Sequence, residues 1–201
     1  MNRALLVVDV QESFRQRPMW ATSSAPDIAD RVARLVTASR VAGDLVVWVL
    51  HAEPGTDDVF DPALGFVRPI EGLVPQNGDP VVTKTSHNAF TTTNLQQLLT
   101  LHSVGHVMVS GIRTEQCCET TARVASDLGY EVTFVIDATA TNPIENPDAA
   151  PGRSVEEILA DPTTLPVEEI LERTRYALSG RFATVKTVDD VVGEVAAGVA
   201  S

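Results

Sequence analysis

The chain has 201 residues, with 15 Lys or Arg against 27 Asp or Glu, so its formal net charge is −12. This length suits one domain with a sizeable core, and we expect residues 1–201 to form a single domain. The apolar content of 44% excludes wholesale disorder. The acidic balance argues against binding to nucleic acid or to anionic lipid, so we expect neither a nucleic-acid nor a membrane partner.

Three features of the sequence indicate the cellular compartment in which the protein resides. The apolar run at residues 4–8 is too short for a signal peptide, and no stretch reaches the roughly 18 apolar residues of a membrane span. The two cysteines, Cys117 and Cys118, are adjacent, and neighbouring cysteines rarely form a disulfide. These features predict a cytoplasmic protein without a disulfide framework.

Short β-branched runs alternate with longer amphipathic segments along the chain. This alternation is typical of βαβ units and predicts an α/β fold with a parallel sheet. The expected strands are residues 4–8, 45–50, 81–83, 107–109, 132–136 and 183–185. The expected helices are residues 27–42, 94–102, 115–128, 167–178 and 189–199.

A proline-rich segment interrupts this pattern at residues 138–166. It holds five of the twelve prolines, so it cannot form one continuous element. A loop of this length in a small domain is usually either functional or part of an interface. An irregular surface excursion with a short helix at residues 155–159 is an equally good interpretation.

Two charged residues follow or end expected strands. Ligands of a parallel α/β sheet bind beyond the carboxyl ends of its strands. Asp9 follows the first strand, where burial would raise its pKa and suit it to proton transfer, although it could instead cap the next segment. Lys84 ends the third run and could hold a nearby carboxylate or thiolate in its charged form, or simply face solvent.

The strongest local signal is the segment around the two cysteines. Thr114 is a good N-cap for the helix expected at residues 115–128, which places Cys117 in its first turn. The helix dipole there should lower the pKa of the thiol and favour a nucleophilic thiolate. Cysteine is also a common small core residue. The position relative to the cap favours Cys117 as the functional thiol and Cys118 as a core residue.

Other kinds of site have weaker support. None of the four histidines shows metal-ligand spacing, so we expect no metal site. No glycine-rich phosphate loop and no Gly-x-Ser-x-Gly motif occurs. Phe14, Trp20 and Phe90 lie near the motif residues and are candidates for the wall of a substrate pocket, although aromatic side chains are more often part of a core.

Taken together, these blocks resemble the isochorismatase-like cysteine hydrolase superfamily, which includes nicotinamidases and other small-amide hydrolases. The resemblance covers roughly residues 3–137. The matching residues are Ala4 to Gln11 with Phe14, then Lys84, Asn88-Ala89-Phe90 and Thr93-Asn94-Leu95, and finally Gly111-Ile112-Arg113-Thr114 with Cys117 and Thr120 to Arg123.

The resemblance implies a three-layer α/β/α, Rossmann-like fold with about six parallel strands. It also implies a catalytic triad in which Asp9 takes the thiol proton, Lys84 stabilises the charged pair and Cys117 attacks a carbonyl to form an acyl-enzyme. A cis peptide bond would lie between Ile112 and Arg113. The backbone N–H groups of Arg113 and Cys117 would then form the oxyanion hole.

Two departures from the family pattern narrow the range of reactions that we expect. The Asp-x-His metal motif of nicotinamidases is absent, with His51 alone in that region, and true isochorismatases typically lack the cysteine. We therefore predict a cofactor-free hydrolase of a small amide, imide or carbamoyl compound, acting on C–N bonds other than peptide bonds. The alternatives are vinyl-ether cleavage with Asp9 as general acid and a non-catalytic binding or thiol redox-sensing protein. As is common among relatives, we expect a homo-oligomer, a dimer or tetramer.

Overall fold

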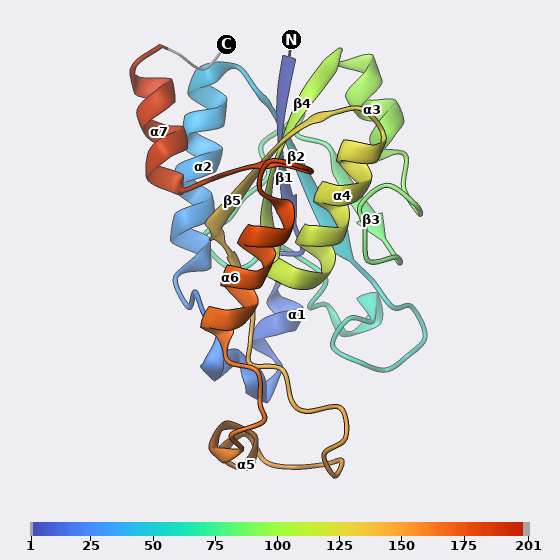
Figure 1. Cartoon of the computed structure of the whole chain (residues 1–201). Coiled ribbons are helices and arrows are strands. Elements are labelled where there is room, and N and C mark those ends of the chain that lie inside the picture. The colour runs from blue at the N-terminus through green and yellow to red at the C-terminus, as the bar shows by residue number, and fades with distance from the viewer. Residues whose placement is uncertain (1, 199–201) are drawn as a thin grey trace.

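The computed structural model describes residues 2–198 and contains one sheet of six parallel strands in the order β3-β2-β1-β4-β5-β6 (Figure 1). Strand β1 lies near the middle of the sheet, where both of its faces are covered. The strands are β1 (Asn2–Val8), β2 (Leu45–His51), β3 (Val81–Lys84), β4 (Val104–Ile112), β5 (Glu131–Ala140) and β6 (Thr184–Lys186).

Helices cover both faces of the sheet and make the three layers that the resemblance implied (Figure 1). Helices α3 (Leu95–Leu101), α4 (Glu119–Asp127) and α6 (Val167–Leu178) pack with Leu6 and Val8 of β1 on one face. Helices α2 (Ile28–Ala42) and α7 (Val188–Ala196) pack with Leu5 and Val7 on the other. Alternate residues of β1 therefore enter two separate cores, which explains why the strand is apolar without alternation from Ala4 to Val8. No helix in the described part of the chain has the length and apolar character needed to cross a membrane.

The expected elements agree with the structure apart from some of their ends. Strands β4 and β5 are longer than expected because polar residues such as His106 and Asp137 interrupt their apolar runs without ending the strand pairing. The helix expected at residues 189–199 is α7, and its expected last residue, Val199, lies outside the described residues.

The short distance between the ends of β1 and β4 depends on Gly111. Its φ of 138° is unfavourable for other residues, and a Cβ built there would lie 1.8 Å from the carbonyl oxygen of Val8. Any side chain at this position would force the two strands apart. One residue further on, the peptide bond between Ile112 and Arg113 is cis, as the resemblance implied.

The proline-rich segment is an ordered excursion beyond the carboxyl ends of the strands, at the bottom of Figure 1. It contains α5 (Val155–Ala160), whose first turn is closed by a capping box between Ser154 and Glu157. A β-bridge between Ile144 and Leu165 closes the base of the excursion. The segment also carries Arg153, whose guanidinium pairs with two carboxylates of the same excursion at 2.5 and 2.6 Å.

Candidate active site

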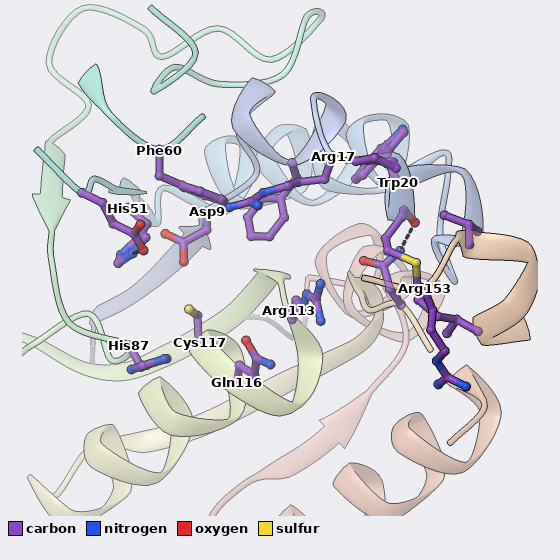
Figure 2. Close-up of a pocket in the computed structure, with 17 residues that line it drawn as sticks. Asp9, Arg17, Trp20, His51, Phe60, His87, Arg113, Gln116, Cys117 and Arg153 are labelled. Atoms are coloured by element: carbon purple, nitrogen blue, oxygen red, sulfur yellow. Dashed lines mark hydrogen bonds and ion pairs between the residues drawn. The ribbon is translucent and has the colours of Figure 1, made fainter. Parts of the chain in front are cut away.

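The ends of four neighbouring strands converge on one cavity. Lys84 ends β3, His51 ends β2, Asp9 follows β1 and Arg113 follows β4, and the sheet order places these four strands side by side. The cavity at this edge has a volume of about 550 Å³, and Asp9, His51, Arg113 and Cys117 are among the residues that line it. Figure 2 shows Cys117 below Asp9, with His51 on one side and Arg113 on the other.

A buried ion pair lies at the floor of this cavity. Lys84 Nζ is 2.7 Å from Asp9 Oδ2, and both side chains are fully buried. The same ammonium donates to Cys117 Sγ at 3.5 Å and to the carbonyl oxygen of Ser86 at 3.1 Å. Burial and the charge of the Asp9 carboxylate both act on the Cys117 thiol, whose pKa they raise. Lys84 thus contacts both of the other predicted catalytic side chains.

The backbone around Asp9 is held firmly. Asp9 itself has a left-handed φ of 55°, and its N–H donates to the carbonyl oxygen of Val49 at 2.8 Å. The buried amide of Gln11 accepts from the N–H of His51 at 2.8 Å and donates to the carbonyl oxygen of His51 at 3.0 Å. These bonds tie the end of β1 to the end of β2, and so fix the Asp9 carboxylate at the cavity floor.

The start of the helical segment that carries Cys117 differs from the expectation. Thr114 is not the N-cap, because its hydroxyl donates instead to Thr139 Oγ1 of β5 at 2.8 Å. Arg113 precedes a wide π-helical turn, Thr114–Cys118, in which the N–H of Cys118 donates to the carbonyl oxygen of Arg113 at 3.1 Å. The regular helix α4 begins only at Glu119.

The two cysteines have different surroundings. Cys117 lines the cavity and contacts Lys84. Cys118 is fully buried in the core formed with Ala122 and Ala125. The geometry therefore offers only Cys117 to a ligand in the cavity.

The expected low pKa of Cys117 is wrong. Burial, followed by the negative charge of Asp9, raises the pKa of Cys117 to about 12, and the Lys84 ammonium only partly opposes this. Burial likewise raises the pKa of Asp9 above its ordinary value, with Lys84 opposing. Desolvation outweighs the helix-terminus effect on which the prediction relied. At neutral pH the thiol is therefore protonated, and its activation requires a base at the moment of attack.

The charge on Asp9 should hold the thiol in its protonated form. We expect Asp9→Asn to speed alkylation of Cys117 at pH 7 by about tenfold for each unit by which its pKa falls, because the thiolate then replaces the carboxylate as the partner of Lys84. Mass spectrometry of the Cys117 peptide gives the rate, with Cys118 as an internal control. Slower alkylation in Asp9→Asn would contradict this electrostatic assignment.

The aromatic pocket candidates fall into two groups. Phe14 and Trp20 line the cavity. Phe90 does not, which corrects that expectation: its ring is buried in the core and stacks on Tyr130, with ring centroids 6.0 Å apart. Proximity to motif residues in sequence did not place Phe90 at the site, because its loop is held to α4 by the bond from the N–H of Ala89 to Thr121 Oγ1.

The proline-rich excursion supplies the outer wall of the cavity. Asn142, Arg153, Val155 and Ile158 all line it, so this segment takes part in the candidate site. Sequence analysis did not assign these residues to the site, nor several others from elsewhere in the chain. The further lining residues are Arg17, Pro18, Met19, Glu53, Phe60, His87 and Gln116.

His51 has two polar neighbours at the edge of the cavity, a lysine and a glutamate. Its Nδ1 lies 3.4 Å from Lys84 Nζ, and its Nε2 lies 3.1 Å from Glu53 Oε1. Within residues 2–198, no three His, Cys, Asp or Glu side chains are grouped so that they could hold a metal ion. His51 is in contact with the ammonium of the buried pair, and its position at the end of β2 was a signal that sequence analysis left unused.

Comparison with known proteins gives the class of the molecule. The model of the Isochorismatase domain matches residues 3–166, a range that includes Asp9, Lys84 and Cys117. The chain belongs to the isochorismatase family of hydrolases.

Individual relatives span most of the chain. The uncharacterized isochorismatase family protein YrdC of Bacillus subtilis is 26% identical, over 96% of this chain and 96% of its own. Nicotinamidase 3 of Arabidopsis thaliana is 33% identical, over 69% of this chain and 73% of its own. A crystal structure of a putative hydrolase of the isochorismatase family from Chromobacterium violaceum has a TM-score of 0.83, with 22% identity, 98% of this chain and 94% of that chain covered. The likeness to this crystal structure shows the fold of the chain and not its activity.

Proposed function

We propose that the protein hydrolyses the C–N bond of a small amide, imide or carbamoyl compound through an acyl-enzyme on Cys117. The observation that carries the proposal is the fully buried Asp9–Lys84 ion pair in contact with the only thiol that lines the cavity, within the described residues. A thiol that is protonated at rest needs a base within reach, and the Asp9 carboxylate supplies one.

The first half-reaction transfers one proton and forms one bond. Cys117 Sγ attacks the carbonyl carbon while its proton passes to the Asp9 carboxylate. The tetrahedral intermediate then expels the nitrogen, which takes the proton from Asp9 and becomes ammonia, an amine or, from an imide, an amide. The acyl group remains on Cys117 as a thioester.

Water completes the cycle. Asp9 takes a proton from the attacking water, the C–S bond breaks, and the thiol regains a proton as the carboxylic or carbamic acid leaves. Lys84 Nζ lies between the Asp9 carboxylate and Sγ and contacts both. Its role is to stabilise whichever of the two partners carries the negative charge.

The carbonyl oxygen needs stabilisation when it becomes an oxyanion. Arg113 and Cys117 both line the cavity, and the proposal assigns this role to their backbone N–H groups. Donors fixed in advance by the backbone stabilise the transition state without reorganising during the reaction.

The size of the cavity and the relationship to nicotinamidase 3 support a small amide as substrate. A volume of about 550 Å³ lies in the usual range for sites that bind small molecules. The name of that relative indicates an amide substrate. The scheme uses no cofactor, since the chain itself supplies the nucleophile, the base and the oxyanion donors.

A test needs a panel of small primary amides, carbamoyl compounds and cyclic imides. The readout is release of ammonia or amine for the first two classes and opening of the ring for the imides. We expect turnover of at least one member, and hydroxylamine added to that reaction should divert part of the acyl group to a hydroxamate. The same assay with Cys117→Ala is the control. It measures any hydroxamate that forms without a thioester on Cys117. Turnover that forms no hydroxamate at any hydroxylamine concentration would argue against the acyl-enzyme.

A further inference from the structure

Three arginines line the cavity, and two of them are neutralised by carboxylates. Arg17 pairs with Asp58 at 2.7 Å. Arg153 pairs with Glu145 and Asp161. Across residues 2–198, by contrast, no carboxylate lies within ion-pair distance of Arg113, and its guanidinium donates no hydrogen bond to another described residue. The cavity therefore presents one uncompensated guanidinium.

The position of this guanidinium suits contact with a substrate. Figure 2 shows the Arg113 side chain in the cavity between Cys117 and Arg153, on the side of Cys117 that is remote from His51. A molecule whose carbonyl carbon sits on Cys117 Sγ would extend one of its ends toward Arg113. Lys84, the other strong cation at the cavity floor, is fully buried and already paired, so it is unavailable to a ligand's charge.

We propose that the Arg113 side chain binds a carboxylate of the substrate, so that the substrate class is a small amide that also carries a carboxylate. This inference rests on the proposed function, because it deepens the description of the same site. The guanidinium offers two parallel N–H donors in the geometry that a carboxylate accepts. Because Asp9 and Glu53 are carboxylates at the same cavity, a singly charged group fits better than a phosphate dianion.

Two alkylating reagents test this without any substrate. Iodoacetate and iodoacetamide attack the same Cys117 sulfur and differ in carrying a carboxylate or a neutral amide. The raised pKa of the thiol affects both rates equally, so it cancels in their ratio. We expect the iodoacetate-to-iodoacetamide rate ratio at Cys117 to fall about tenfold in Arg113→Met, since a charge-assisted hydrogen bond is lost.

Two further variants are matched controls. Arg17→Met also removes an arginine from the cavity wall, but one whose charge Asp58 already cancels, so its ratio should stay within about twofold of wild type. Arg113→Lys keeps the charge without the planar fork and should restore part of the ratio. An equal fall in Arg17→Met and Arg113→Met, or no fall in Arg113→Met, would overturn the assignment.

A measurement on the wild-type protein covers the case in which Arg113→Met does not fold. Oxamate, malonamate and succinamate are amides with one carboxylate, and oxamide, malonamide and succinamide are their neutral counterparts. We expect at least one of the acids to protect Cys117 from iodoacetamide at a concentration about tenfold lower than its counterpart. Equal protection by acid and counterpart, or protection by none of the acids, would overturn the proposal.

These readouts separate the inference from the proposed function. Alkylation and protection require only binding beside Cys117, whereas hydrolysis requires the complete reaction. A selective alkylation ratio without amide turnover would refute the hydrolase and leave the carboxylate site standing. Amide turnover together with an alkylation ratio that Arg113→Met leaves unchanged would keep the hydrolase standing and refute the carboxylate site.

Discussion

Replacing Cys117 with alanine is expected to lower amide hydrolysis by about 10⁴-fold or more, because the variant lacks the atom that forms the acyl-enzyme. The thiol side chain is small and reaches the cavity surface, so the fold should change little. Release of ammonia or amine under single-turnover conditions measures the loss, and circular dichroism verifies that the variant is folded.

The adjacent cysteine is the matched control. Cys118 is fully buried in the core and does not line the cavity. Cys118→Ala should therefore cost about 1 kcal/mol of stability and leave the hydrolysis rate within about twofold of wild type. A Cys117→Ala variant that kept full activity would show that the thiol is dispensable. Acid chemistry by Asp9, as in vinyl-ether cleavage, would then replace the nucleophilic mechanism.

Replacing Lys84 with methionine should cost stability as well as activity. Lys84 and Asp9 are both fully buried, so the substitution leaves the Asp9 carboxylate without a counter-charge in the core. Removal of one partner of a buried ion pair typically costs about 3–5 kcal/mol in the free energy of unfolding. Urea unfolding measures this change, and amide turnover should be lost in the same variant because neither the thiolate nor the carboxylate is stabilised.

The double variant Asp9→Asn with Lys84→Met separates the effect of the unpaired buried charge from the effect of lost packing. It removes both ions together, so most of the lost stability should return while the activity stays absent. Methionine keeps an unbranched side chain of similar length in the core. A Lys84→Met protein as stable as wild type would mean that the buried pair contributes nothing to the fold. A double variant no more stable than Lys84→Met would assign the loss to packing.

Much of the site could be predicted because the rule for parallel sheets is geometric. Residues at the carboxyl ends of parallel strands gather at one edge of the sheet. This is how Asp9, which follows β1, comes to form an ion pair with Lys84, which lies 75 positions later at the end of β3, on the other side of β2. The same rule applied to β2 selects His51, which the sequence analysis weighed only for metal binding. Its contact with Lys84 follows from the register in which His51 pairs with Lys84 between the two strands.

Other features depend on packing that no local pattern encodes. The pKa of Cys117 follows from its burial and from the charge of Asp9, whereas the sequence indicated only its place near a helix start. Thr114 is a favourable N-cap by residue type, but a bond to Thr139 of the neighbouring strand uses its hydroxyl. Proline content predicted that residues 138–166 form no single continuous element. In the structure, residues 138–140 are the end of β5 and residues 155–160 form α5. The proline content gave no indication that this excursion folds back over the cavity and contributes Arg153 to its wall.

The most direct test of the acyl-enzyme is the mass of the Cys117 peptide from a reaction that is quenched with acid during turnover of an amide from the panel. We expect that peptide to gain the mass of the substrate's acyl group, and the gain to disappear when the substrate is exhausted. The Cys118 side of the same peptide should stay unmodified in the fragmentation spectrum. Continued turnover with Cys117 unmodified throughout, and equal turnover by Cys117→Ala, would contradict the mechanism.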